Sequence, residues 1–359
     1  MGYSIDVNIL LANPNPRLVR EILGKDVVKF FSHPEMGNDK TYLQEASIPE
    51  TSRLEDEIYT VTPTASTRTL LTHGRDYNFM IKTDLDKRHY RFIRRLKGSS
   101  VLHSVQISQE LERITSSGNL EEYSFLPESI GIVAGDKDSG AGVLFREIVP
   151  RPVTSNTSVL IPYFSLYAKD LKNPDDLPLL VQLIKHNSRS GDELGYFAET
   201  ILGKIVRNWT KFATEYGLLI ELHGQNTLLE VDESLQPQRI VHRDFQSIYV
   251  DRKIREQRGL PIPFRKHIVG EEVGTDRPKQ FSIAYDHLVG DFLLDRLART
   301  FLEYFPGYSY QQIANNVKGI FNRGFPNANE IFPNQTYTYG PQVGNVVNLV
   351  VKHTEPVFR

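Results

Sequence analysis

The sequence predicts an α+β fold in which antiparallel sheets lie beside packed helices. Segments 129–148 and 218–245 each contain two strand-like runs separated by a polar turn, which is typical of a β-hairpin. Segments 192–216, 281–305 and 308–321 carry apolar residues at three- and four-residue spacing, which indicates amphipathic helices. Together these elements give the α+β class.

Length and composition favour a large globular protein. A chain of 359 residues suggests about two domains, or one enzyme core with an appendage. Hydrophobic residues at 40% and charged residues at 24% are the ordinary mix of a soluble protein. The 42 Lys and Arg nearly balance the 44 Asp and Glu, so a globally basic nucleic-acid binder is disfavoured.

The absence of cysteine excludes several kinds of site. Without thiols the chain has no disulfide scaffold, no thiolate nucleophile, no Cys-ligated zinc and no Cys-ligated iron–sulfur cluster. No stretch approaches the roughly 18 apolar residues of a spanning helix, and the N-terminus lacks a signal-peptide pattern. We therefore expect a cytoplasmic protein with neither a membrane nor a nucleic acid as its partner.

The N-terminal part contains two candidate sites. A short helical run around 17–31 is followed by the hydroxyl-rich segment 62–69, which is expected to form a turn leading into extended chain. Segment 81–98 then holds seven basic residues and two acids. If it is helical from Lys87, Lys87 and Arg91 share a face suited to phosphate or carboxylate. A solvated helix surface is the equally simple alternative.

The middle of the chain contains the clearest elements. Runs 129–134 and 142–148 flank a Gly- and Asp-rich turn and predict a hairpin. Segment 192–216 is predicted to be a helix that ends at Gly217, a usual C-terminal residue. Trp209 follows the apolar spacing of that helix, so we expect it in the core.

The second hairpin carries the residues best suited to chemistry. If 218–231 is a strand, Glu221, His223 and Gln225 project from one face. Burying them unpartnered would cost about 1–3 kcal/mol per group, so they either bond one another or line a wet cleft. Asn226 adds an amide to the same place.

The returning strand of this hairpin ends in Arg243 and Asp244, a cation for anionic oxygens and a carboxylate for a divalent metal. This constellation could hold a nucleotide triphosphate with magnesium. A structural histidine and a structural Arg–Asp pair remain the alternatives. The sequence contains no His-Glu-x-x-His motif, no phosphate-binding P-loop and no Gly-x-Gly-x-x-Gly motif.

Four motifs in this order resemble the signature of the IucA/IucC family, the NRPS-independent siderophore (NIS) synthetases. They are Ser66-x-Arg68-Thr69, Lys82 with a downstream arginine, Glu221-x-His223-x-Gln225-Asn226, and Arg243-Asp244. The resemblance implies a fold shaped like a cupped hand, with antiparallel sheets in fingers and palm. It implies three parts: a reduced thumb-like segment 1–60, a fingers-like ATP-binding region 61–190, and a palm-like catalytic region 191–359. The chain resembles a short form that lacks most of the family's N-terminal region.

The resemblance also implies an activity. Members are ATP-dependent ligases that activate a carboxylic acid as an acyl adenylate and condense it with an amine or hydroxyl, in siderophore or related biosynthesis. The implied ligands are ATP and Mg²⁺, the implied partners are small-molecule substrates, and a homodimer is compatible with the family. Two alternatives stay open: an ATP-dependent phosphotransferase, and a degenerate member that binds a nucleotide or another small molecule without turnover.

The family's functional residues carry over by position. By resemblance, Ser66, Arg68 and Thr69 hold phosphates, and Lys82 and Arg91 neutralise phosphate or the substrate carboxylate, with Arg94 in reserve. His223 donates to the carboxylate or the α-phosphate, and Gln225 and Asn226 orient ATP. Asp244 and Glu221 are the implied magnesium ligands, and Arg243 positions that carboxylate or reaches a phosphate.

Overall fold

The computed structural model describes most of the chain, in two compact units. The described residues are 2–4, 7–24, 28–36, 44, 53–54, 59–66, 68–73, 77–89, 92–118, 120–154, 159–272, 274–339, 350–352 and 355–359. Unit 1 comprises Met1–Ser117, Leu126–Val153 and Asp244–Gln246, and unit 2 comprises Gly118–Phe125, Thr154–Arg243 and Ser247–Arg359. Antiparallel sheets and helices occur in both units, so the α+β class is confirmed.

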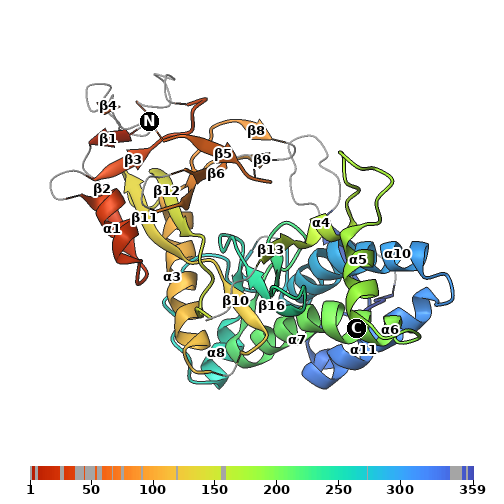
Figure 1. Ribbon diagram of the computed structural model, residues 1–359. Coiled ribbons are helices and arrows are strands. Elements are labelled where there is room, and N and C mark those ends of the chain that lie inside the picture. The colour runs from red at the N-terminus through yellow and green to blue at the C-terminus, as the bar shows by residue number, and fades with distance from the viewer. Residues whose placement is uncertain are drawn as a thin grey trace. The chain divides into compact units, whose positions relative to one another are not determined.

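A six-stranded sheet forms the centre of unit 1 (Figure 1). Its order is β2 (Val7–Leu11), β11 (Glu128–Ala134), β12 (Ala141–Glu147), β7 (Phe79–Thr83), β6 (Thr69–Thr72) and β5 (Val61–Pro63), and each neighbouring pair is antiparallel. Ile132 pairs with Val143, so the predicted hairpin is confirmed.

The two faces of this sheet pack against different helices because side chains alternate along each strand. Ile81, Ile130 and Val143 face a core that includes α1 (Pro16–Leu23). The opposite face packs against α3 (Gly98–Thr115) (Figure 1). The expected helix over 17–31 is thus shorter than predicted, because the chain returns as strand β3 (Lys29–Phe31).

The basic segment 81–98 is not a helix, so the predicted helical face was wrong. Its strands are β8 (Arg88–His89) and β9 (Phe92–Ile93), and the helix begins only at Gly98. Asp84 accepts the Leu96 backbone N–H and pairs with Arg95, whose guanidinium also contacts Asp86 at 3.1 Å. Contacts of Asp84 and Asp86 with Arg95 and the Leu96 backbone therefore hold this segment in a folded-back conformation. The remaining strands of unit 1, β1 (Gly2–Ser4) and β4 (Arg53–Leu54), join β3 in a three-stranded sheet.

Unit 2 contains a four-stranded sheet and two strand pairs. The sheet order is β10 (Tyr123–Phe125), β16 (Pro237–His242), β15 (Thr227–Val231) and β13 (Val159–Pro162), with only β10–β16 parallel. The pairs are β14 (Leu218–Leu219) with β17 (Tyr249–Val250), and β18 (Tyr337–Tyr339) with β19 (Val350–Lys352). The second predicted hairpin is confirmed in β15 and β16, although its first strand starts later than expected.

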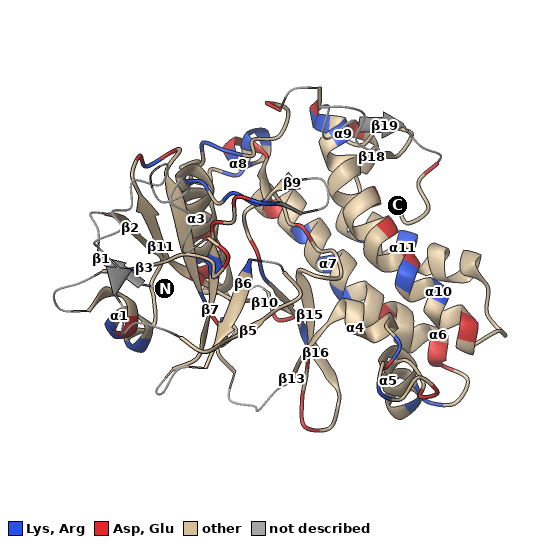
Figure 2. Ribbon diagram, turned by 90° about the horizontal axis from the view of Figure 1, so that it is seen from above, with Lys and Arg blue, Asp and Glu red and all other residues tan. Residues whose placement is uncertain are grey.

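The predicted helices of unit 2 are confirmed. The first is continuous through α6 (Glu193–Tyr196), η2 (Phe197–Leu202), α7 (Gly203–Lys211) and η3 (Phe212–Tyr216); the second runs through α9 (Arg277–Ser282), η4 (Ile283–Leu294) and α10 (Asp295–Tyr304). The third predicted helix is α11 (Tyr310–Gly324). Unit 2 also contains the helices α4 (Tyr163–Tyr167), α5 (Leu179–Asn187), α8 (Arg252–Gln257) and η5 (Ala328–Glu330). Basic and acidic residues are interspersed on α8 and α10 (Figure 2).

Two residues anchor the first of these helices as predicted. Gly217 ends it in the left-handed conformation at φ 58°, where a side chain is disfavoured. Trp209 is fully buried, and its ring centroid lies 4.7 Å from that of Tyr285.

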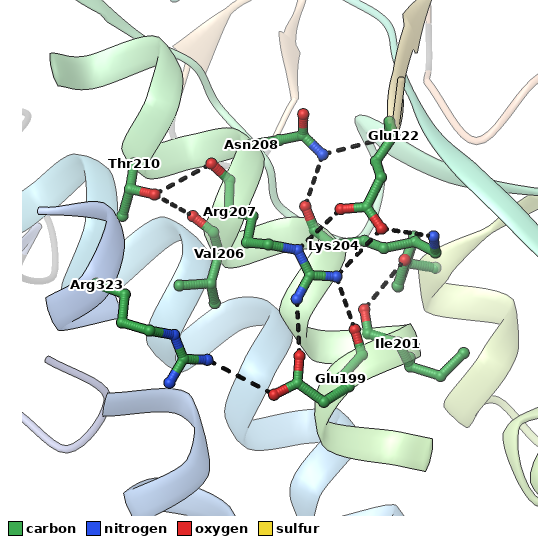
Figure 3. Close-up of polar contacts among 10 residues, drawn as sticks. Glu122, Glu199, Ile201, Lys204, Val206, Arg207, Asn208, Thr210 and Arg323 are labelled. Atoms are coloured by element: carbon green, nitrogen blue, oxygen red, sulfur yellow. Dashed lines mark hydrogen bonds and ion pairs between the residues drawn. The ribbon is translucent and has the colours of Figure 1, made fainter. Parts of the chain in front are cut away.

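An ion-pair network fixes the start of β10 to this helix (Figure 3). Glu122 accepts from Lys204 at 2.9 Å and from Arg207 at 2.8 Å. Arg207 also pairs with Glu199 at 2.9 Å. Segment 118–125 belongs to unit 2, although the residues on both sides of it belong to unit 1. Glu122 and β10 are therefore held in unit 2 by ion pairs as well as by strand pairing.

Among the described residues, no helix combines the length and the apolar character needed to cross a membrane.

Candidate functional site

The predicted site residues fall into two clusters, one in each unit. Unit 1 holds Ser66, Arg68, Thr69, Lys82 and Asp244, and unit 2 holds Glu221, His223, Gln225, Asn226 and Arg243. Arg91 lies outside the described residues. We describe each cluster by itself.

A tight turn positions the first cluster between β5 and β6. The Ser66 N–H donates to the Thr64 hydroxyl at 3.2 Å, and that hydroxyl donates to the Thr69 carbonyl at 2.9 Å. Thr69 then lies directly opposite Lys82 on the neighbouring strand β7. The hydroxyl-rich sequence thus folds as predicted into a turn and brings the Ser-x-Arg-Thr motif next to Lys82.

Lys82 is buried and paired with a carboxylate. Its side chain is 1% exposed, and its Nζ lies 2.5 Å from the Asp244 Oδ1. Burial lowers the pKa of Lys82, and the Asp244 charge opposes this shift. Burial pushes the pKa of Asp244 upward, but Lys82 and Arg146 outweigh burial and hold it well below its ordinary value. Lys82 and Asp244 are therefore placed as a buried ion pair.

A second buried pair lies beside the first. Arg146 donates to Glu128, and both side chains are almost fully buried. The Arg146 Nη2 also lies 4.0 Å from the Asp244 Oδ2. Glu128 therefore compensates Arg146, while Asp244 lies between two cations.

Arg68 differs because its hydrogen-bond partners are all neutral. Its Nη1 donates to the carbonyls of Arg94 and Arg95 at 2.9 and 2.8 Å, and its Nη2 donates to the Gln246 Oε1 at 2.6 Å. A guanidinium has five N–H donors, so two remain without a partner among the described residues. Burial lowers the pKa of Arg68, and the Asp244 charge partly offsets this.

The hydroxyl of Thr69 is a buried group without a hydrogen-bond partner among the described residues. The residue is 1% exposed. Buried polar groups normally have a partner, so the Thr69 hydroxyl, on the residue opposite Lys82, is an unused hydrogen-bonding group in this cluster.

The second cluster is a loop, so the predicted common strand face of Glu221, His223 and Gln225 was wrong. After β14 the chain leaves the sheet over 220–226 and turns at 224–226. The Gly224 carbonyl accepts the Phe164 N–H at 3.1 Å. A Cβ at Gly224 would lie 2.7 Å from the Tyr167 hydroxyl. A side chain at this position would require the Tyr167 hydroxyl to move, so glycine allows the loop to lie close to α4.

His223 is oriented by its own loop. The Gln225 N–H donates to the His223 Nδ1 at 3.1 Å, which places the hydrogen of a neutral ring on Nε2. This Nε2 lies 3.6 Å from the Glu221 Oε1. The three residues therefore lie together, through loop geometry rather than strand alternation.

Asn226 and Arg243 join this loop to the end of β16. The Arg243 N–H donates to the Asn226 carbonyl at 2.9 Å, and its guanidinium Nε donates to the Gln225 carbonyl at 3.1 Å. The hairpin therefore brings Arg243 to the His223 loop, as the sequence indicated.

The two implied magnesium ligands belong to different units, Asp244 to unit 1 and Glu221 to unit 2. Within the described chain, no group of three or more His, Cys, Asp or Glu side chains could hold a metal ion. The Asp244 side chain is 25% exposed, and its Oδ1 is paired with Lys82.

Sequence reasoning missed three members of the first cluster as site residues: Glu128, Arg146 and Gln246. The signal for the first two was a charged residue at each end of an apolar hairpin, since buried charges are normally paired. Gln246 had no comparable signal, because its contact with Arg68 spans 178 positions.

Two family models match separate parts of the chain. Residues 41–168 match the IucA / IucC family. Residues 197–299 match the ferric iron reductase FhuF-like transporter family. The first range contains the Ser-x-Arg-Thr motif and Lys82, and the second contains the His223 loop and Asp244. None of the curated protein sequences matches the chain.

Solved structures match nearly the whole chain. The petrobactin biosynthesis protein AsbB from Bacillus anthracis str. Sterne has a TM-score of 0.76 at 16% identity, over 99% of this chain and 67% of AsbB. The ATP-bound aerobactin synthetase IucA from Klebsiella pneumoniae has a TM-score of 0.71 at 14% identity, over 99% of this chain and 69% of IucA. Aerobactin synthetase IucC from the same organism has a TM-score of 0.70 at 15% identity, over 99% and 68%. At such low identities, these likenesses show that the fold is shared.

Proposed function

We propose that the protein is an ATP-dependent, AMP-forming ligase, because residues 41–168 match the IucA / IucC family model and the chain shares the fold of AsbB and of aerobactin synthetase IucA. It activates a carboxylic acid as an acyl adenylate and condenses it with an amine or hydroxyl. The product is a siderophore or a related natural product. We assign the enzyme to the cytoplasm, where ATP is available.

The observation that carries this proposal is the state of Arg68. A buried guanidinium whose bonded partners are neutral keeps its full charge, and two of its donors are still available. Arginine binds phosphate through such paired N–H groups. The orphan Thr69 hydroxyl and the neighbouring Lys82 add a donor and a second cation. These groups suit a polyphosphate.

The same residues suit the chemistry of adenylation. An oxygen of the substrate carboxylate attacks the α-phosphorus, a new O–P bond forms, and pyrophosphate leaves with the electron pair of the broken bond. Arg68 and Lys82 are proposed to stabilise the charge on the phosphate oxygens during this step, because preorganised cations in a buried site need no reorganisation.

His223 is proposed to act on the substrate end. Its Nδ1 is occupied by the Gln225 N–H, so Nε2 carries the hydrogen that is donated to the substrate carboxylate or the α-phosphate. Gln225, Asn226 and Arg243 hold the loop and orient ATP. In the second step the nucleophile attacks the acyl carbon, AMP leaves, and the nucleophile loses a proton.

Magnesium fits this scheme as an ion that enters with ATP. Mg²⁺ usually takes one or two carboxylates, substrate phosphates and water, and would neutralise phosphate charge. Asp244 is our principal protein ligand, and Glu221 is the second candidate.

We also propose a functional division of the chain. In this division, residues 61–190 are the fingers-like ATP-binding region, 191–359 the palm-like catalytic region, and 1–60 a thumb-like segment.

Isotope exchange between pyrophosphate and ATP tests the proposal. With Mg²⁺ and a panel of carboxylic acids, we expect exchange that depends on one acid or a group of related acids. No exchange with any acid, in a protein that binds ATP tightly, would favour a nucleotide-binding protein instead.

A further inference from the structure

The three buried cations of unit 1 have different counter-groups. Lys82 has the carboxylate of Asp244, and Arg146 has the carboxylate of Glu128. Arg68 instead has two backbone carbonyls and the side-chain amide of Gln246. Arg68 is therefore the member of this group that has no carboxylate among its hydrogen-bond partners.

The short segment Asp244–Gln246 sets this pattern. These three residues belong to unit 1, although the chain on both sides of them belongs to unit 2. The segment is anchored by the Phe245 N–H, which donates to the Glu128 Oε2 at 3.4 Å. Asp244 takes the left-handed conformation at φ 73°, which is uncommon for a residue other than glycine. The segment therefore places the Asp244 carboxylate against Lys82 and, two positions later, the Gln246 side-chain amide against Arg68.

The neutral partners of Arg68, including the Gln246 amide, use only some of the N–H groups of its guanidinium. Both N–H groups of Nη1 go to carbonyls, and Gln246 takes one N–H of Nη2. The N–H of Nε and one N–H of Nη2 have no partner among the described residues, and arginine binds phosphate oxygens through such N–H groups. A carboxylate in place of the amide would keep the side-chain size but cancel the charge.

We infer that Gln246 is a positioning residue that orients Arg68 for a phosphate group while leaving the Arg68 charge uncompensated. This inference rests on the proposed function. It goes further by assigning a role to a neutral residue outside the motifs, and by placing the principal anion-binding edge at Arg68.

Three variants measured by isothermal titration with ATP and with pyrophosphate test the inference. Gln246→Glu is expected to weaken the binding of both ligands at least tenfold, while the thermal midpoint stays equal or rises because Glu pairs with Arg68. Gln246→Met removes the acceptor without adding charge and is expected to weaken binding only about threefold. The control Gln257→Glu makes the same chemical change on the exposed side of α8 and should bind like the wild type.

Two outcomes would overturn the inference. One is wild-type affinity in Gln246→Glu. The other is an equal loss in the Glu and Met variants, since the charge would then not matter. If Gln246→Glu does not fold, unchanged affinity in Gln246→Met would also overturn it.

Failure of the proposed function gives a different result. A wild-type protein that binds pyrophosphate but not ATP, with the same ranking of variants, would refute the ligase and retain the role of Gln246. A wild-type protein that binds neither ligand would refute both.

Discussion

The Lys82 ammonium and the Asp244 carboxylate form a buried ion pair, with 2.5 Å between Nζ and Oδ1, across 162 positions of sequence. The pair joins strand β7 to Asp244, a residue in the left-handed backbone region. Such conformations cost about 1–3 kcal/mol for residues other than glycine and persist where surrounding contacts enforce them. The ion pair with Lys82 is one contact that holds Asp244 in this conformation.

Removing the carboxylate charge should therefore be costly. Asp244→Asn leaves Lys82 buried with a neutral partner, and we expect the free energy of unfolding to fall by about 3 kcal/mol at pH 7. Because the Asp244 pKa is held low in the folded state, this advantage is present above the ordinary aspartate pKa of about 3.9 and fades as pH falls below it. Urea denaturation of the wild type and the variant at pH 7 measures the loss of stability, and the same comparison at pH 3 measures how far that loss shrinks. The control Asp138→Asn changes an exposed turn residue and should have little effect.

The orphan hydroxyl of Thr69 gives a prediction with a matched control. Thr69→Val should leave stability unchanged or slightly higher, because no hydrogen bond among the described residues is lost. It should weaken ATP binding about fivefold, as expected for one hydrogen bond. Thr72→Val on the same strand removes two bonds to the Phe79 backbone and should cost about 1–3 kcal/mol of stability. Equal destabilisation by both changes would contradict the role of Thr69.

His223 should matter for adenylation more than for folding. His223→Ala is expected to lower acid-dependent pyrophosphate exchange about 100-fold, as for loss of one preorganised donor, with little change in the circular dichroism spectrum. His186→Ala, a change at an exposed histidine of α5, serves as the control. Wild-type exchange in His223→Ala would exclude this residue from the site.

The Glu122 network predicts a stability effect outside the site (Figure 3). Burial raises the Glu122 pKa, but hydrogen bonds from Arg207 and Lys204 outweigh burial and lower it. Glu122→Gln should cost about 1 kcal/mol at pH 7, a modest value because the side chain is 36% exposed and solvent screens the pairs. The cost should shrink as pH falls below the ordinary glutamate pKa of about 4.3. Denaturant titration of the neighbouring exposed variant Glu121→Gln should show no such pattern.

Local patterns predicted the hairpin 129–148 and the helix over 192–216 because both depend on periodicity and turn residues near in sequence. The same reasoning failed at 87–97, where charge composition suggested a helix face. The acids Asp84 and Asp86 instead pair with Arg95 and fold the segment back, and a helical periodicity argument contains no term for that contact.

In the candidate site, too, local sequence patterns predicted some features, while contacts between distant parts of the chain could not be predicted. The 220–226 segment alternates like a strand, but Gly224 packs against Tyr167 and the chain bends. The motif residues were recognisable by type and order. Gln246, the partner of Arg68, was not, because that contact spans 178 positions of sequence.

Identification of the nucleotide product tests the central claim most directly. The protein is incubated with ATP, Mg²⁺, a panel of carboxylic acids and hydroxylamine as the nucleophile, and the products are separated by chromatography and mass spectrometry. The account predicts AMP, pyrophosphate and a hydroxamate of the accepted acid in equal amounts. Formation of ADP with a phosphorylated product would contradict it and establish phosphoryl transfer instead.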